Sequence, residues 1–283
     1  MDHMERLVYT YSEDAILLEG VVIEPTGAQA KPVALVWVHG LTGKFYTPTT
    51  IDMGRALASR GYSLVAGNNR GHDFGAVLYT REGKSILAGS GWEAFDECPR
   101  DIAAWIAFTA GLGYKGVALA GHSLGALKVA YYQAERQDPR VLGLIAASAP
   151  RQAARHNPDM VALAEKMVVS GRGQDLLPMG PSRAGAYTLS AQTLLNRVRT
   201  GLDVYGFDTP NAAISRLSCP ILALYGTREE ATGGAAELEA IRGNATASPR
   251  VETRLIEGAD HSYHGHQREV AAAIADWMAT LVG

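Results

Sequence analysis

The sequence predicts an α/β fold with a mostly parallel, doubly wound sheet. Several short runs of the chain are almost entirely apolar, which is typical of strands buried on both faces of a parallel sheet. Segments with helical spacing of apolar residues separate these runs. With 47% hydrophobic and 19% charged residues among 283, the composition agrees with a globular protein that has a large core.

The elements can be assigned in chain order. Residues 5–24 alternate polar and apolar side chains and stop at Pro25-Thr26-Gly27, which predicts a pair of antiparallel strands. The run PVALVWVH at residues 32–39 predicts the first buried strand, and a helical pattern follows over residues 51–60. The same alternation predicts a strand at 62–68, a helix at 96–109, a strand at 116–121, a helix at 124–136 and a strand at 141–147.

The alternation stops at Pro150 and resumes about one quarter of the chain later. In between, helical stretches at 160–169 and 191–200 lie among Gly- and Pro-rich loops, without a strand-like run. The remaining predictions are a strand at 220–225, a helix start at 233–240, a strand at 251–256 and an amphipathic helix at 268–281. We therefore expect a core domain of residues 1–150 and 218–283, with a helical insertion at 151–217 that forms a lid over a ligand crevice.

Charge and cysteine content exclude several classes of protein. The net charge is about −3 and no basic patch stands out, so no nucleic-acid partner is expected. Cys98 and Cys219 lie far apart and no Cys/His spacing resembles a metal site, so we expect neither a disulfide framework nor a metal. The N-terminal segment lacks an apolar leader and no run of 18 apolar residues exists, which predicts a cytoplasmic protein without a membrane partner. A homo-oligomer is left open.

The most specific motif is Gly121-His122-Ser123-Leu124-Gly125, between a predicted strand and a predicted helix. A serine on so sharp a turn needs small neighbours, and the two glycines leave that space. The helix that begins at Leu124 directs N–H groups and its positive dipole end at a developing oxyanion. The motif resembles the nucleophile elbow of the α/β-hydrolase superfamily, which implies that fold and a nucleophilic role for Ser123. His122 is adjacent and is expected to give packing or polar support.

The resemblance also implies a base, an acid and an oxyanion hole. In this superfamily the histidine comes last, after the final strand, and His261 occupies that place, with His264 as its main competitor and His266 close by. The acid is expected after the strand at 220–225. Glu229 falls there, although family sequences often have aspartate. Glu230 is the second candidate and an acid after the strand at 141–147 the third, whereas Asp260 abuts the histidine too closely to reach its ring.

Two loops complete the resemblance. His39-Gly40-Leu41-Thr42-Gly43 resembles the HG loop that supplies one oxyanion N–H, so Leu41 and Leu124 would be the two donors and His39 would be structural. The segment 68–73 (NNRGHD) resembles the D-x-R-G-H-G loop of many family members, with asparagines at its start, and is expected to brace the HG turn. The HG segment does not supply the G-x-G-x-x-G turn that a dinucleotide cofactor requires, and no cofactor is expected.

The function implied is a carboxylesterase-like serine hydrolase that cleaves a small to medium-sized carboxylic ester through an acyl-enzyme. Thioesters, lactones and amides would use the same groups. The alternatives are a C–C bond hydrolase, a cofactor-free haloperoxidase-like enzyme, or a non-catalytic ligand-binding protein of this fold. The natural substrate is not specified. Apolar residues of the insertion could line an acyl pocket, but the core face of a helix would look the same: Met160, Met167, Leu176, Leu177, Met179, Tyr187 and Tyr205.

Overall fold

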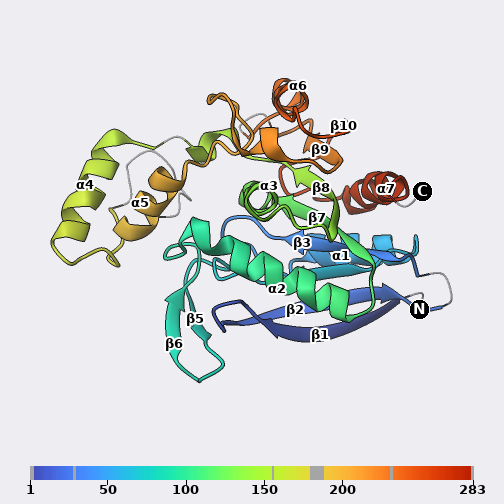
Figure 1. The fold of residues 1–283 in the computed structure, drawn as a ribbon, viewed down its shortest axis with the longest axis horizontal. Coiled ribbons are helices and arrows are strands. Elements are labelled where there is room, and N and C mark those ends of the chain that lie inside the picture. The colour runs from blue at the N-terminus through green and yellow to red at the C-terminus, as the bar shows by residue number, and fades with distance from the viewer. Residues whose placement is uncertain (1–2, 28–29, 155, 179–187, 230–231, 282–283) are drawn as a thin grey trace.

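In the computed structural model of the protein, an eight-stranded sheet forms the centre of the molecule (Figure 1). The structure describes residues 3–27, 30–154, 156–178, 188–229 and 232–281. The strand order is β1-β2-β4-β3-β7-β8-β9-β10. Their bounds are β1 His3–Tyr11, β2 Leu17–Pro25, β3 Val33–Val38, β4 Leu64–Gly67, β7 Gly116–His122, β8 Val141–Ala147, β9 Ile221–Gly226 and β10 Val251–Ile256.

Most neighbouring strands run parallel, as the sequence predicts. The pairs from β4 through β3, β7, β8 and β9 to β10 are all parallel, and only β1–β2 and β2–β4 are antiparallel. Every residue of β3, β4 and β9 is buried, because helices cover both faces of the sheet. The carboxyl ends of the parallel strands share one edge of the sheet, and the loops at this edge carry the candidate site.

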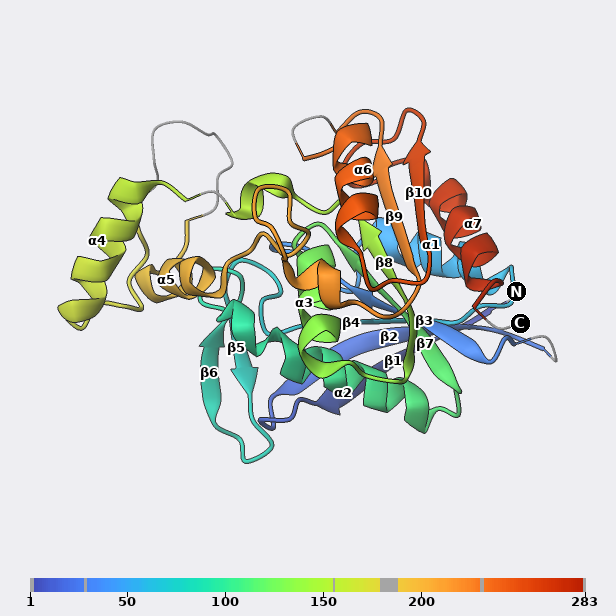
Figure 2. The same cartoon turned by 45° about the horizontal axis from the view of Figure 1, so that its top comes forward.

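Helices cover the two faces in separate groups. On one face α1 (Pro48–Ala58) and α7 (Gln267–Met278) contact each other and bury apolar residues such as Leu57 and Trp277. On the other face lie α2 (Cys98–Gly111), α3 (Leu124–Arg136) and α6 (Ala235–Asn244). Figure 2 shows the α1–α7 pair and the α2–α3 pair on opposite sides of the strands.

A two-stranded hairpin lies outside the main sheet. It pairs β5 (Ala76–Tyr79) with β6 (Ser85–Ala88) in antiparallel register. No helix or strand was predicted for this part of the chain. Its strands have four residues each and expose Val77 and Leu87, so the pattern of a half-buried strand is too short to stand out.

The insertion is helical in its described part, as predicted. It contains short 3₁₀ turns at Arg151–Ala154 and Ala213–Arg216 and two α-helices, α4 (Pro158–Val169) and α5 (Ala191–Thr200). The helices α4 and α5 project together at one end of the molecule (Figure 1). They enclose a small core of their own, formed by Ala164, Met167, Leu177, Ala191 and Leu194.

Hydrogen bonds and a buried ion cluster attach the insertion to the segment before α2. The N–H of Ser190 donates to the carbonyl of Gly91 at 2.8 Å, and the indole N–H of Trp92 donates to the carbonyl of Gln174 at 2.9 Å. Glu93 accepts bonds from Lys128 of α3 at 2.6 Å and from Arg197 of α5 at 3.2 Å. The insertion is therefore tied to α3, the helix that begins after Ser123.

Cys98 and Cys219 are both buried free thiols. Among the described residues, no helix is long and apolar enough to cross a lipid bilayer.

Candidate active site

Ser123 lies on a strained turn between β7 and α3. Its backbone has φ 55° and ψ −124°, in a region that residues other than glycine rarely adopt. A Cβ on Gly121 would lie 2.1 Å from the carbonyl oxygen of Gly125, and a Cβ on Gly125 would lie 2.2 Å from that of Val38. Both positions therefore require glycine, which is the physical reason for the spacing of the motif.

His261 and Glu229 form a hydrogen-bonded chain with Ser123. The Nε2 atom of His261 lies 3.0 Å from Ser123 Oγ, and its Nδ1 atom lies 2.8 Å from Glu229 Oε2. Because a carboxylate only accepts hydrogen bonds, Nδ1 carries the proton and Nε2 is free to accept the hydroxyl proton of Ser123. The three side chains come from the ends of β7, β9 and β10, which bring residues distant in sequence to one edge of the sheet.

The carboxylate of Glu229 is buried and fully oriented. Its Oε1 atom accepts hydrogen bonds from the backbone N–H of Gly226 and, at 2.7 Å, from the hydroxyl of Ser148. The hydroxyl of Tyr263 lies 2.5 Å from that of Ser148 and donates to it, since the proton of Ser148 is directed at the carboxylate. Burial raises the pKa of Tyr263 well above its usual value, which keeps this hydroxyl protonated. Glu229 therefore has one oxygen fixed by its surroundings and the other free for His261.

His122 supports the backbone of His261. Its Nε2–H donates to the carbonyl oxygen of His261 at 2.6 Å, and its ring stacks on the indole of Trp37 with an interplanar angle of 10°. Burial lowers the pKa of His122 to about 4, so the ring is neutral at physiological pH. The expected role of His122 in packing and polar support is confirmed by these contacts.

The competing candidates lie elsewhere or outside the described residues. His264 is exposed and bonds Asp260 at 2.8 Å, and His266 bonds Glu269 at 3.0 Å. Asp260 also accepts bonds from the backbone N–H groups of Ser262 and His264, and not from the ring of His261. Glu230 falls outside the described residues. After β8, where an acid was the third alternative, the chain has Ser148, which bonds Glu229 instead.

The HG loop approaches Ser123 closely. A Cβ on Gly40 would lie 2.9 Å from the Cβ of Ser123, so only glycine permits this approach. His39 fixes the turn: its Nδ1–H donates to the carbonyl of Gly40 at 2.9 Å, while Nε2 accepts the N–H of Asn69 at 3.0 Å. Burial lowers the pKa of His39 to about 3, so the ring stays neutral and keeps one donor nitrogen and one acceptor nitrogen.

Two N–H groups near Ser123 are available for a ligand. Leu124 is the first residue of α3, where a backbone N–H has no acceptor within the helix. Among the described residues, no backbone carbonyl accepts the N–H of Leu41. These are the two groups expected to form an oxyanion hole.

The segment 68–73 braces the HG loop, as predicted. Besides the bond from Asn69 to His39, the side chain of Asn68 accepts the N–H of Phe45 at 3.1 Å. Arg70 is buried and bonds the fully buried Asp101. This network holds the loop that carries Leu41.

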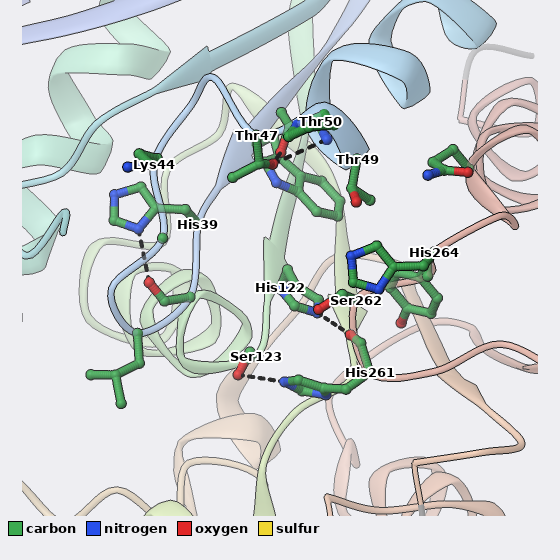
Figure 3. Close-up of a pocket in the computed structure, with 17 residues that line it drawn as sticks. His39, Lys44, Thr47, Thr49, Thr50, His122, Ser123, His261, Ser262 and His264 are labelled. Atoms are coloured by element: carbon green, nitrogen blue, oxygen red, sulfur yellow. Dashed lines mark hydrogen bonds between the residues drawn. The ribbon is translucent and has the colours of Figure 1, made fainter. Parts of the chain in front are cut away.

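Ser123 opens into a cleft of about 480 Å³ between the HG loop, the start of α1 and the His261–Gln267 segment (Figure 3). Trp37, Leu41, Thr49, His264 and Gln267 are among its lining residues, together with Ser123 and His261. No described residue of the insertion lines this cleft. A covering role for residues 151–217 therefore stays a prediction.

Four of the apolar residues of the insertion that could have formed an acyl pocket pack elsewhere. Met167 and Leu177 lie in the small core of the insertion, and Met160 packs against that core. Tyr205 is fully buried in the main core, and its hydroxyl donates to the carbonyl of Ala126 at 2.8 Å. Leu176 is partly exposed, and Met179 and Tyr187 lie outside the described residues.

Sequence reasoning missed Ser148, Tyr263 and the cluster of Glu93 with Lys128 and Arg197. The position of Ser148, directly after a buried strand at the carboxyl edge of the sheet, is the signal that could have singled it out. In the described part of the chain, no group of three or more His, Cys, Asp or Glu side chains is arranged to hold a metal ion.

Comparison with known proteins gives a family and several similar structures. A model of the alpha/beta hydrolase family matches residues 35–273. Est1E from Butyrivibrio proteoclasticus, solved with ferulic acid, is 18% identical with a TM-score of 0.69, over 97% of this chain and 99% of that one. A highly thermostable carboxyl esterase from Bacillus coagulans, in complex with glycerol, is 13% identical with a TM-score of 0.72, over 99% of each chain. A search of curated protein sequences found no match.

Proposed function

We propose that this chain, which belongs to the alpha/beta hydrolase family, is a serine hydrolase that cleaves a carboxylic ester through an acyl-enzyme. The observation that carries the proposal is the continuous chain of hydrogen bonds from Glu229 through His261 to Ser123. Such a chain activates a serine hydroxyl, which is a weak nucleophile on its own. The esterases with similar structures support an ester as substrate, although their low identity establishes only the fold.

In the first half of the proposed reaction, Ser123 Oγ attacks the ester carbonyl while His261 Nε2 takes its proton. The negative charge that develops on the carbonyl oxygen would be stabilised by the N–H groups of Leu41 and Leu124. Glu229 holds the imidazole with Nε2 toward Ser123 and stabilises the imidazolium. His261 then gives its proton to the leaving alcohol oxygen, and the acyl group remains on Ser123.

In the second half, water replaces the alcohol. His261 takes a proton from the water, whose oxygen attacks the acyl carbon, and the same two N–H groups stabilise the second oxyanion. When the tetrahedral intermediate collapses, His261 returns the proton to Ser123 Oγ and the carboxylic acid leaves. A cleft of about 480 Å³ fits a small to medium-sized substrate.

The other functions considered differ in testable ways. A ligand-binding protein of this fold would have no need of an oriented base, whereas His261 is held by Glu229 and His122. C–C bond cleavage and haloperoxidase-like chemistry would use the same serine and histidine, so only substrates distinguish them. No contact in the described residues favours either one.

The proposal is tested with p-nitrophenyl esters of increasing chain length and the variant Ser123→Ala. We expect the wild type to hydrolyse one or more of these esters, and the variant to lose activity on the order of 10⁴-fold or more. The melting temperature should change little, because the Ser123 hydroxyl contributes no packing in the core. Ester hydrolysis at the wild-type rate by Ser123→Ala would overturn the proposal.

A further inference from the structure

We infer that the cleft beside Ser123 binds a neutral alcohol group that carries several hydroxyls, so that the substrates are esters of polyols or sugars and not of simple alkanols. The inference rests on the proposed function and names the part of the substrate that the cleft recognises. It is carried by four polar side chains that line the cleft with unused hydrogen-bonding groups.

The position of the cleft identifies the part of the ester that enters it. His261 Nε2, which bonds Ser123 Oγ, has to reach the oxygen of the leaving alcohol. The alcohol part of the ester must therefore lie on the His261 side of Ser123. The cleft extends on this side, along Ser262, His264 and Gln267, toward the first turn of α1.

Four side chains offer unused hydrogen-bonding groups to this part of the cleft. The hydroxyls of Thr49 and Ser262 and the amide of Gln267 make no hydrogen bond to any described residue, nor does the Nε2 atom of His264. In Figure 3 the side chain of Thr49 points toward the side on which His264 lies, and Ser262 lies next to His261. A ligand without hydroxyls would displace water from these groups and leave them unpaired, which costs binding energy.

The chemistry of these groups favours hydroxyls over an acid. In the tautomer of His264 whose Nδ1–H donates to Asp260 at 2.8 Å, the Nε2 atom carries no hydrogen and accepts a hydrogen bond. The hydroxyls and the amide both donate and accept. A ligand hydroxyl, which also donates and accepts, can pair with each of the four groups, whereas a carboxylate could not pair with the imidazole nitrogen.

The charges around the cleft are balanced within the protein. Lys44, the only lysine that lines the cleft, bonds Asp73 at 2.9 Å, and the ring of His264 has Asp260 as its partner. Thr47 and Thr50, which also line the cleft, bond each other at 2.8 Å. Since the lining has no arginine and its one lysine is paired with a carboxylate, the cleft has no excess positive charge for a phosphate or carboxylate on the alcohol.

The test compares glycerol 1-monobutanoate with propyl butanoate, which share the acyl group and differ by two hydroxyls on the alcohol. We expect kcat/KM to be about 10-fold or more higher for the glycerol ester, because a site built for hydroxyls discriminates against an analogue that lacks them. Equal values for the two esters would overturn the inference while leaving the proposed function intact. If none of the three esters is cleaved (glycerol 1-monobutanoate, propyl butanoate and p-nitrophenyl butanoate), the inference and the proposed function are both overturned.

Variants locate the preference in the cleft. Thr49→Val and Gln267→Leu should each lower the ratio of the two kcat/KM values by roughly 2- to 10-fold, the usual range for one lost hydrogen bond. Gln192→Leu is the matched control, because Gln192 lies in the first turn of α5 as Gln267 does in α7, but does not line the cleft. It should keep the wild-type ratio. A ratio that stays unchanged in both Thr49→Val and Gln267→Leu would contradict the assignment of the alcohol to this cleft.

Discussion

Hydrogen bonds fix the position of the proton on each buried or catalytic imidazole near Ser123. His261 has its proton on Nδ1 because Glu229 accepts it, and His122 has one on Nε2 because the carbonyl of His261 accepts it. His39 donates from Nδ1 to Gly40 and accepts at Nε2 from Asn69. The proposed base and the loop of the proposed oxyanion hole are thus both oriented before a substrate binds, which is the condition for electrostatic preorganisation.

Removal of the proposed base should be as damaging as removal of the nucleophile. We expect His261→Ala to lower kcat about as much as Ser123→Ala, and the double variant to be little worse than either, because the two residues act as a unit. Steady-state kinetics with one p-nitrophenyl ester give kcat for the two single variants and the double variant. His266→Ala is the control and should keep most activity, since the side chain of His266 bonds Glu269 and not Ser123 or Glu229. An active His261→Ala enzyme would refute the assignment.

Glu229 and Ser148 should differ in the size of their effects. Glu229→Gln removes the charge and allows the amide to favour the wrong tautomer of His261, so we expect a loss of roughly 10⁴-fold in kcat. Ser148→Ala removes only one bond to the carboxylate and should cost about 10-fold or less, with KM nearly unchanged. If Ser148→Ala were as inactive as Glu229→Gln, Ser148 would have a more direct role than orientation of the carboxylate.

His39 should make the protein less stable in acid. Its pKa is lowered by burial from 6.5 to about 3 in the folded state, so between these values the unfolded chain binds a proton that the folded protein does not. Stability is therefore lost as pH falls below 6.5, by at most about 1.4 kcal/mol per pH unit from this group. Denaturant unfolding of wild type and His39→Asn between pH 7 and 4 measures it. The variant should have a shallower dependence, and parallel curves would show that His39 does not titrate in this way.

The insertion and α3 are connected by a buried ion cluster. Glu93 and Lys128 are each about 1% exposed and Arg197 about 9%, so all three charges lie away from water. Burial alone would raise the pKa of Glu93, but the cations of Lys128 and Arg197 outweigh it and lower the pKa. Glu93 also fills the space beside Gly71, where a Cβ would lie 1.7 Å from its carboxylate. One carboxylate thus joins α5, α3 and the loop that follows β4.

Loss of this carboxylate should destabilise the whole molecule. Glu93→Gln keeps the volume but leaves two buried cations without their counter-charge, and we expect a loss of about 3–5 kcal/mol in the free energy of unfolding. Glu135→Gln is the matched control, because Glu135 pairs with Arg216 at the surface, where such a pair contributes about 0–1 kcal/mol. Urea unfolding compares the two. Equal free energies of unfolding for Glu93→Gln and Glu135→Gln would mean that the cluster does not hold the insertion to α3.

At the scale of the molecule, the sheet brings the site together. Its inner parallel strands were predictable because they are short, nearly continuous apolar runs, and Ser123 because two glycines at fixed spacing leave room for a strained turn. Glu229 follows β9, which could be recognised in the same way, whereas His261 follows β10, whose sequence VETRLI mixes polar and apolar residues. Ser123, Glu229 and His261 could be predicted because each follows a strand, and the position of a strand is encoded by its local sequence.

The parts that could not be predicted depend on contacts between distant segments. Ser148 is a common residue type, and only the packing of β8 beside β9 brings its hydroxyl to Glu229. Glu93, Lys128 and Arg197 have the sequence pattern of surface charges. Their burial follows from the way α5 packs on the 3₁₀ turn Phe95–Glu97 before α2, and from the bonds that Lys128 and Arg197 both make to Glu93. The packing of Met160, Met167, Leu177 and Tyr205 in cores could not be predicted for a related reason, because a helical apolar face gives no information about which partner covers it.

The central claim is that Ser123 is the activated nucleophile, and the most direct measurement is the site of labelling by a fluorophosphonate. Such a probe reacts with a serine only where a base has activated it. We predict one adduct per chain, found by peptide mass spectrometry on the peptide that contains Ser123, and no adduct in Ser123→Ala or His261→Ala. Labelling of another serine, or no labelling of the folded wild type, would contradict the account.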